Sequence, residues 1–229
     1  MITIIGGQKG GTGKSTLTTN LAVAFQSRGN SVIIIDADVA QPNTSYWAAR
    51  REESDQPAIT VVRKDGDLRH TLKELNQSYD HVLVDPVGHA GEELITALEV
   101  ADLLLTPVRP SQPDLESLRY IDELVRAKRV YNPKLRAMVV ISQAPTHYQI
   151  TLAQEARTAI SSLPSLKVAD TIVHHRTAFI DAMSGSLGVT ELKLPAATAA
   201  ASEIWKLADE LWPANLIKLS HNKNRVGDR

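Results

Sequence analysis

A glycine- and lysine-rich segment near the start of the chain has the residue types that bind phosphate. The segment reads Gly10, Gly11, Thr12, Gly13, Lys14, Ser15 and Thr16. Backbone N–H groups of a glycine-rich turn can converge on phosphate oxygens, because no Cβ blocks the approach. A lysine in such a turn contacts the β- and γ-phosphates, and the next hydroxyl binds Mg²⁺. The segment therefore predicts a nucleotide site, with Lys14 on the phosphates and Ser15 on the metal.

Three aspartates lie where they could serve the metal or a water nucleophile. Asp36 and Asp38 follow the apolar run Ile33-Ile34-Ile35, and Asp85 follows the apolar residues 82–84. Ligands of open α/β sheets bind at the carboxyl ends of the strands, so all three carboxylates are expected at the binding rim. Together with the glycine-rich turn, Asp85 predicts a second magnesium contact. For Asp36, a helix N-cap after the strand is the alternative.

Short β-branched runs alternate with amphipathic stretches along the chain. This alternation is typical of βαβ units, and it predicts an α/β fold with a mainly parallel, twisted sheet and helices on both faces. Strands are expected over residues 2–6, 31–36, 59–62, 81–85, 103–108, 137–142 and 168–172, and helices over 14–28, 67–77, 113–131, 153–161 and 197–211. The glycine-rich turn then joins the first strand to the first helix, which is the context that a phosphate-binding loop requires.

The composition favours one domain and excludes some chemistry. A chain of 229 residues with 43% hydrophobic residues can bury one substantial core, which we assign to residues 1–212, with a partly disordered tail over 213–229. The absence of cysteine excludes disulfides, thiolate zinc sites and iron–sulfur ligation by this chain. With a net charge of −1, nucleic-acid binding would depend on local patches. We expect a cytoplasmic protein, because no apolar run reaches the roughly 18 residues of a membrane span.

The phosphate-binding turn departs from the ordinary motif in two places. Gln8 stands where G-x-x-x-x-G-K-[ST] requires glycine, and Lys9 adds a second lysine. In this form the turn resembles the deviant Walker A motif of the ParA/MinD family of P-loop ATPases. The resemblance implies ATP and Mg²⁺ as ligands, and a homodimer in which Lys9 reaches the nucleotide of the other subunit. There it would stabilise the charge that develops during hydrolysis.

The resemblance also gives roles to residues outside the turn. It implies that Asp36 belongs to the magnesium shell, that Asp38 positions or activates the attacking water, and that Asp85 is the Walker B aspartate. Gln143 and Pro145 fall where relatives hold the adenine base. The catalytic candidates are therefore Lys9, Lys14 and Asp38.

Short members of this family partition DNA, and the resemblance implies the same function here. ATP would close the dimer, the dimer would bind nonspecific double-stranded DNA, and a ParB-type centromere-binding adaptor would stimulate hydrolysis. The candidate DNA contacts are Arg176, Lys193, Lys206 and Lys218. The protein would then be associated with the nucleoid.

A MinD-like, membrane-associated positioning ATPase is the alternative. Such proteins end in a basic amphipathic helix that lies in the lipid interface. Residues 204–212 do present an apolar face, which includes Ile204, Leu207 and Leu211. However, acidic residues dilute its charge, and packing onto the sheet explains the face without lipid. A small-molecule kinase or amidoligase would need a substrate pocket that the sequence does not reveal, and Lys9 argues against it.

Overall fold

The computed structural model describes residues 1–146 and 150–213, which form a seven-stranded sheet. Its strand order is β3-β2-β4-β1-β5-β6-β7, and every pair is parallel. The strands are β1 (Ile2–Ile5), β2 (Val32–Asp36), β3 (Thr60–Arg63), β4 (His81–Asp85), β5 (Leu103–Val108), β6 (Arg136–Ala144) and β7 (Lys167–His174). All seven predicted strands are present, and the sheet is wholly rather than mainly parallel.

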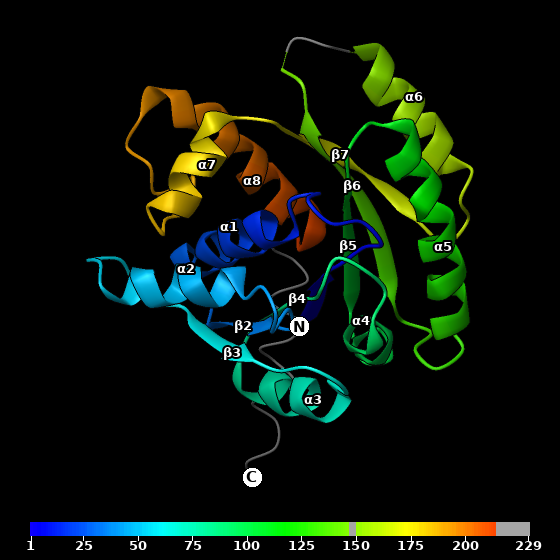
Figure 1. The fold of residues 1–229 in the computed structure, drawn as a ribbon, viewed down its shortest axis with the longest axis horizontal. Coiled ribbons are helices and arrows are strands. Elements are labelled where there is room, and N and C mark those ends of the chain that lie inside the picture. Colours follow the sequence, from blue (N-terminus) through cyan, green and yellow to red (C-terminus); the bar gives the residue numbers. More distant parts are fainter. Residues whose placement is uncertain (147–149, 214–229) are drawn as a thin grey trace.

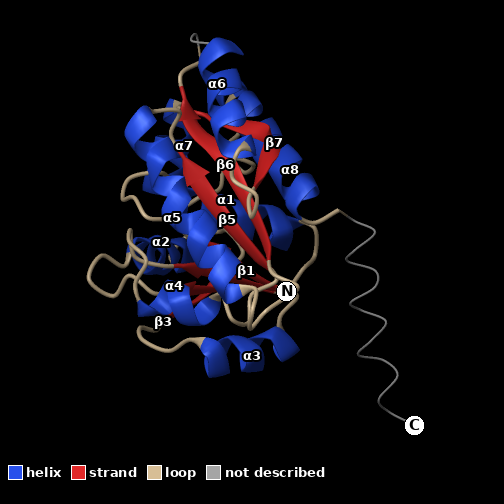
Figure 2. Ribbon diagram, turned by 90° about the vertical axis from the view of Figure 1, so that its right-hand side faces the viewer, coloured by secondary structure: helices blue, strands red, loops and turns tan. Residues whose placement is uncertain are grey.

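Helices cover both faces of the sheet (Figure 1). On one face lie α1 (Lys14–Ser27), α2 (Asn43–Glu52), α7 (Thr177–Ser184) and α8 (Thr198–Leu211). The other face carries α3 (Arg69–Ser78), α4 (Glu92–Ala97), α5 (Gln112–Lys128) and α6 (Ile150–Ser161). Figure 2 shows the strands between α8 on one side and α5 on the other. The predicted α/β architecture is confirmed.

Three of these helices, α2, α4 and α7, were not predicted from the sequence. All three are short, so few turns are available to reveal a helical period. In α2 the period is also hidden, because the buried side includes Thr44 and Arg51 beside Trp47 and Ala48. A buried arginine reads as a surface residue in a sequence pattern, since arginine is almost never fully buried unless it is paired.

Side chains on the central strands alternate between two cores. Ile34 of β2 and Leu83 of β4 belong to the core beneath α1, whereas Ile33 and Val82 belong to the opposite core. Because side chains on one face recur every second residue, Asp36 and Asp85 point to the α1 side. The two aspartates are also register partners on neighbouring strands. The sheet therefore delivers both carboxylates to one place beside α1.

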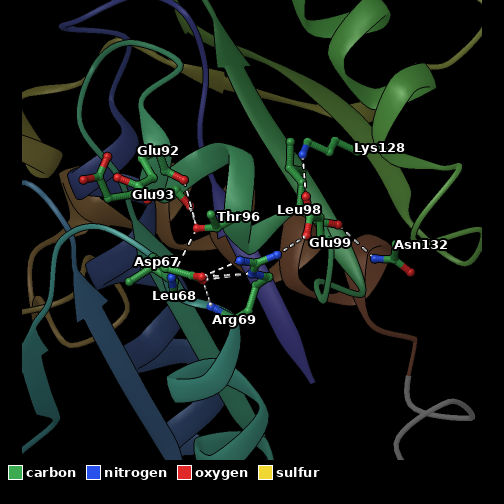
Figure 3. Close-up of polar contacts among 10 residues, drawn as sticks. All are labelled: Asp67, Leu68, Arg69, Glu92, Glu93, Thr96, Leu98, Glu99, Lys128 and Asn132. Carbon is green, nitrogen blue, oxygen red and sulfur yellow. Dashed lines mark hydrogen bonds and ion pairs between the residues drawn. The ribbon is translucent and has the colours of Figure 1, made fainter.

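Glu99, just after α4, ties together the helices of the second face (Figure 3). It accepts hydrogen bonds from Arg69 of α3 at 3.0 Å and from Lys128 of α5 at 2.6 Å. Thr96 of α4 accepts a hydrogen bond from the backbone N–H of Leu68 at 3.2 Å. Because α4 follows the loop after Asp85, these contacts fix the far end of that loop.

Carboxylates of α8 accept hydrogen bonds from backbone N–H groups of the edge strand β7. Glu210 accepts from the N–H groups of Asp170 at 2.5 Å and Thr171 at 3.0 Å, and Glu203 accepts from that of His174 at 3.1 Å. Unpaired N–H groups on an edge strand can recruit a strand from another molecule. Here α8 satisfies three of them within the chain.

The apolar face of α8 is buried in the core. Ile204, Leu207 and Leu211 are fully buried, and the adjoining Trp212 donates from Nε1 to the hydroxyl of Thr3 at 3.1 Å. Packing on the sheet thus accounts for this face. Among the described residues, no helix has both the length and the apolar character needed to cross a membrane. The division into a domain over 1–212 and a tail over 213–229 stays a prediction, since 214–229 lie outside the described part.

His81, at the start of β4, is buried among aromatic rings. Its ring stacks on Phe25 at a centroid distance of 4.0 Å and meets Trp212 edge-on at 6.3 Å. Neither ring nitrogen has a hydrogen-bond partner in the described part of the chain. Burial, followed by the nearby N-terminal charge, lowers the pKa of His81 from 6.5 to about 4. The folded protein therefore holds this imidazole neutral.

His81→Phe should reduce the loss of stability in mild acid. Between pH 6.5 and 4 the unfolded chain protonates His81 and the folded protein does not, so the wild type loses stability as pH falls. From these two pKa values the loss is about 2 kcal/mol at pH 5. Urea unfolding of both proteins at pH 7.5 and 5.0 measures the effect. If the free energies of unfolding of the wild type and His81→Phe differed by the same amount at both pH values, the conclusion that His81 is buried in its neutral form would be wrong.

Candidate phosphate and metal site

The glycine-rich segment forms the turn between β1 and α1, as predicted. Gly11 and Gly13 have φ values of +69° and +95°, a left-handed conformation that favours glycine. Lys14 is largely buried, and its Nζ donates to the carbonyl oxygen of Lys9 at 3.0 Å. Burial lowers the pKa of Lys14, while the carboxylates of Asp85 and Asp38 act in the opposite direction. The cation is thus held over the turn, with two carboxylates nearby.

The end of β6 holds this turn in place. Ser142 donates from its hydroxyl to the carbonyl oxygen of Thr12 at 2.9 Å, and Gln143 donates from Nε2 to that of Gly11 at 2.8 Å. Gln143 adopts a φ of +51°, which is uncommon for a residue other than glycine. The residue that we predicted at the adenine base therefore supports the phosphate turn in this structure.

A cavity of about 650 Å³ opens over the turn. Its lining combines the predicted phosphate residues Gly10, Gly11, Gly13, Lys14, Ser15 and Thr16 with residues from four other segments, which include Asp38, residues 86–89, Gln143 and Met183. The loop after β4 lies directly against the turn, because a Cβ added to Gly88 would lie 3.0 Å from Cα of Gly10. The structure thus brings the glycine-rich turn, the Asp38 segment and the loop after Asp85 together around one space.

Asp36 and Asp85 each keep one buried oxygen without a partner. Oδ2 of Asp36 accepts from the backbone N–H and the hydroxyl of Ser45 at 2.8 and 2.7 Å. Within the described part of the chain, Oδ1 of Asp36 and Oδ1 of Asp85 have no hydrogen-bond donor. A buried carboxylate oxygen without a donor is unfavourable, and a cation would satisfy it. Asp36 therefore caps the first turn of α2 with one oxygen and leaves the other for a metal.

The environment of Asp85 also fits a cation. Burial raises its pKa to about 7; a hydrogen bond with Ser15 lowers it, and the charge of Asp36 raises it. A divalent ion would favour the ionised form of Asp85. The described residues contain no closed cluster of three or more histidine, aspartate or glutamate side chains that could hold a metal alone. Mg²⁺ is commonly bound by one or two carboxylates plus substrate phosphates, so the donor set fits it.

Asp38 and Lys9 lie at the open side of the site. Asp38 is half-buried and lines the cavity, and its Oδ1 accepts from the backbone N–H of Gln41 at 3.0 Å. Lys9 is exposed, and its ammonium has no ion pair among the described residues. The two lysines of the turn thus differ: Lys14 folds inward, and Lys9 is available to a group outside this chain.

A second cavity, of about 330 Å³, adjoins the turn beside α7. Thr12, Gly13 and Thr16 border it from the turn, and its outer lining includes Val173, His174, His175, Arg176, Phe179, Ile180 and Met183. A partly apolar cavity next to a phosphate site suits a nucleobase. Pro145 is exposed and is not among the residues that line either cavity.

Sequence reasoning missed the α7 side of this second cavity. The signal in the sequence was weak, because α7 is a short apolar helix that follows β7 closely. The predicted strand also ended at residue 172, two residues before the end of β7. With the correct end of β7, the rule that ligands bind at the carboxyl ends of parallel strands would have pointed to residues 173–176.

The four predicted DNA contacts have different surroundings. Arg176 donates from Nε and Nη2 to Glu203 at 3.1 and 2.7 Å and lines the second cavity. Lys206 is exposed beside a cavity lined by three carboxylates, one of them Glu203. Acidic neighbours of both residues work against contact with phosphate. Lys193 is exposed without a described ion pair, and Lys218 lies outside the described residues.

Comparison with known proteins establishes the family. Residues 3–187 match the family model described as the CobQ/CobB/MinD/ParA nucleotide binding domain. The chain belongs to the ParA/MinD family. This ParA/MinD protein is 29% identical over 208 residues to the maintenance of carboxysome distribution protein A of Halothiobacillus neapolitanus, covering 90% of this chain and 94% of that protein. The family predicted from the deviant motif is confirmed.

Two further proteins are similar over most of the chain. Protein IncC of Escherichia coli is 24% identical over 241 residues, which cover 88% of this chain and 66% of IncC. The septum site-determining protein MinD from Pyrococcus horikoshii, solved with Mg-ADP, has a similar fold with a TM-score of 0.72 and 17% identity. That match covers 95% of this chain and 98% of the MinD chain. At this identity the likeness to MinD concerns the fold alone.

Asp85→Asn should stabilise the nucleotide-free protein. Asp85 ionises near pH 4 in the unfolded chain but near pH 7 in the folded protein, so the wild type loses stability as pH rises between these values. Asparagine keeps the shape without the charge. In EDTA at pH 8 we expect the midpoint of thermal unfolding to rise by roughly 5 °C or more.

The same variant tests the metal. Mg²⁺ should raise the unfolding midpoint of the ADP-bound wild type and leave that of ADP-bound Asp85→Asn unchanged. Asp55→Asn, at an exposed carboxylate after α2, should behave like the wild type in both respects. A preserved magnesium response in Asp85→Asn would rule out Asp85 as part of the metal site.

Proposed function

We propose that this protein hydrolyses ATP to ADP and phosphate and uses the cycle to partition DNA cargo. The observation that carries the proposal is the contrast between the two lysines of the phosphate turn. Lys14 is held over the turn by its own backbone contact, whereas Lys9 is exposed with no described ion pair. A single subunit therefore supplies one lysine to its own nucleotide and offers a second to another subunit.

The proposed roles follow the positions of the side chains. N–H groups of residues 10–16 and the Lys14 ammonium bind the phosphates, and the free oxygens of Asp36 and Asp85 together with the Ser15 hydroxyl hold Mg²⁺. When bound, Mg²⁺ would neutralise part of the charge of the phosphates. Asp38, at the open side of the cavity, orients the attacking water and accepts its proton. Lys9 of a second copy donates to the oxygens on which negative charge develops.

This assignment of Lys9 implies a homodimer that forms on ATP. We further propose that the dimer binds nonspecific double-stranded DNA of the nucleoid and that a ParB-type centromere-binding adaptor stimulates hydrolysis. Lys193 is the best supported of the proposed DNA contacts, because Arg176 and Lys206 have acidic neighbours. The membrane alternative loses its main support, since the apolar face of α8 is buried against the sheet.

A second candidate differs in its cargo. The relative that matches 90% of this chain is named for the distribution of carboxysomes, so a protein compartment is the other cargo to consider. The adaptor encoded beside the protein decides between the two. An adaptor for DNA partition protects one specific DNA site from nuclease digestion, whereas an adaptor for a compartment binds the compartment's shell and protects no such site.

Lys9→Ala and Asp38→Ala should separate nucleotide binding from hydrolysis. Both variants should bind Mg-ATP close to wild-type affinity, because Lys14 and the turn remain. Turnover should fall by about 100-fold or more in both variants, because Lys9→Ala removes a charge-stabilising donor and Asp38→Ala removes the general base. Lys73→Ala, at an exposed lysine of α3 on the opposite face, is the control and should hydrolyse ATP normally. Normal turnover by Lys9→Ala would refute the proposal that Lys9 of one subunit acts on the nucleotide of the other.

DNA retention should require ATP and weaken steeply with salt. Lysine and arginine contacts release counterions from DNA, so we expect a large loss of affinity between about 50 and about 200 mM salt. Lys193→Glu should weaken binding to all sequences alike, while Lys73→Glu should have little effect. Gel-shift measurements with and without ATP test this. Binding that does not depend on ATP, or that appears only with lipid vesicles, would remove the DNA proposal.

A further inference from the structure

A buried ion pair ties α2 to the segment that follows α7. Arg51, near the end of α2, is 0% exposed, and its guanidinium donates to both carboxylate oxygens of Glu191 at 2.6 and 2.9 Å. Its remaining donors reach the carbonyl oxygens of Pro57 at 2.9 Å and Ser186 at 3.0 Å. The guanidinium also lies 5.2 Å from the ring centroid of Trp47. Each of the three guanidinium nitrogens thus has a hydrogen-bond partner that fixes its position.

The same segment is bound to α1, the helix that begins at the phosphate turn. A Cβ on Gly188 would lie 2.8 Å from Cγ1 of Val23 in α1, so the Gly188 backbone packs directly against that side chain. The N–H of Val189 donates to Oδ1 of Asn20 at 2.7 Å, and Nδ2 of Asn20 donates to the carbonyl oxygen of Thr16 at 2.7 Å. The segment after α7 therefore joins the end of α2 to the first turn of α1.

The other end of α2 is fastened to the metal site. Ser45, in the first turn of α2, donates its N–H and hydroxyl to one oxygen of Asp36, and the second oxygen stays free for a cation. A displacement of α2 would pull Ser45 away from Asp36 and would turn the carboxylate. The helix is thus held at its start by Asp36 and near its end by Arg51.

A gain in stability does not by itself explain the buried ion pair of Arg51 and Glu191. The desolvation of two buried charges offsets most of their attraction, and apolar residues of similar size are often as stabilising. What the bidentate pair adds is a fixed distance and angle between α2 and the neighbouring segment. This favours a role in geometry.

We propose that Arg51 and Glu191 are positioning residues for the magnesium site. Their ion pair holds α2 where Ser45 can orient Asp36, with one oxygen free for the metal. The segment that carries Glu191 follows α7, and Met183 of that helix lines both the phosphate cavity and the second cavity. The inference rests on the proposed function only in that Asp36 belongs to the magnesium shell.

The primary test is the Mg²⁺ dependence of ATP binding in Glu191→Gln, measured by calorimetry with a non-hydrolysable ATP analogue. Glutamine keeps the size and removes the charge. Loss of an outer-shell partner typically weakens metal affinity by about 10-fold or more, so the Mg²⁺ concentration at half-effect should rise by at least that factor. Binding of the same analogue in EDTA should not change. Arg51→Lys, which keeps the charge, should show a smaller rise.

Two further variants separate positioning from general damage. Ser45→Ala should also raise the Mg²⁺ concentration at half-effect. In the double variant, Glu191→Gln should raise that concentration little further, because both substitutions act through the contact between Ser45 and Asp36. Asp209→Asn breaks the exposed pair that Arg28 and Asp209 form at 2.8 Å, and it should leave the Mg²⁺ dependence unchanged. If Glu191→Gln did not fold, the apolar pair Arg51→Met with Glu191→Leu would replace it and should show the same rise in Mg²⁺ requirement.

The outcomes distinguish this inference from the function on which it rests. A wild type whose ATP binding ignores Mg²⁺ would overturn both. A wild type that responds to Mg²⁺, with Glu191→Gln giving the same half-effect concentration, would overturn only the positioning role. Fully additive effects of Ser45→Ala and Glu191→Gln would also overturn it, since the ion pair would then act by a different route.

Discussion

The parallel pairing of β4 with β1 and β2 is the constraint on which the site depends. It places Asp85 between the strand that carries Asp36 and the strand that enters the phosphate turn. Because side chains alternate along a strand, a slip of one residue would turn Asp85 to the opposite core. The register is held by apolar side chains that are buried on both faces, so a largely apolar core determines where the polar groups of the site lie.

This arrangement buries several charged groups, at a cost in stability, near the N-terminal end of α1. Among the described residues, two carboxylate oxygens find no hydrogen-bond donor, and Lys14 is largely removed from water. The surrounding structure holds these groups by contacts from distant segments: β6 supports the turn through Ser142 and Gln143, and α4 anchors the loop that touches Gly10. The site is therefore preorganised for a ligand that brings both negative phosphate and a cation.

The sequence predicted the parts of this protein that depend on local patterns. Short β-branched runs, several of them almost continuously apolar, located all seven strands, and the spacing of Lys9 and Lys14 identified the family. It could not predict α2, because Arg51 is inside the protein only by virtue of Glu191, which lies 140 residues away. Gln143 was expected at the base and lines the second cavity, so that contact stays a prediction; its positive φ and its bond to Gly11 depend on tertiary packing and could not be predicted. The lining of the second cavity likewise arises from segments that only the fold brings together.

The carboxylates that α8 places on β7 have a consequence for assembly. A sheet can grow into a continuous ribbon only if both of its edges accept a new strand. Here Glu203 and Glu210 already accept hydrogen bonds from three N–H groups of β7, so this edge has fewer free donors for a strand from another molecule. Pairing between sheets of two copies is therefore disfavoured at this edge, and assembly through helices and loops is favoured instead.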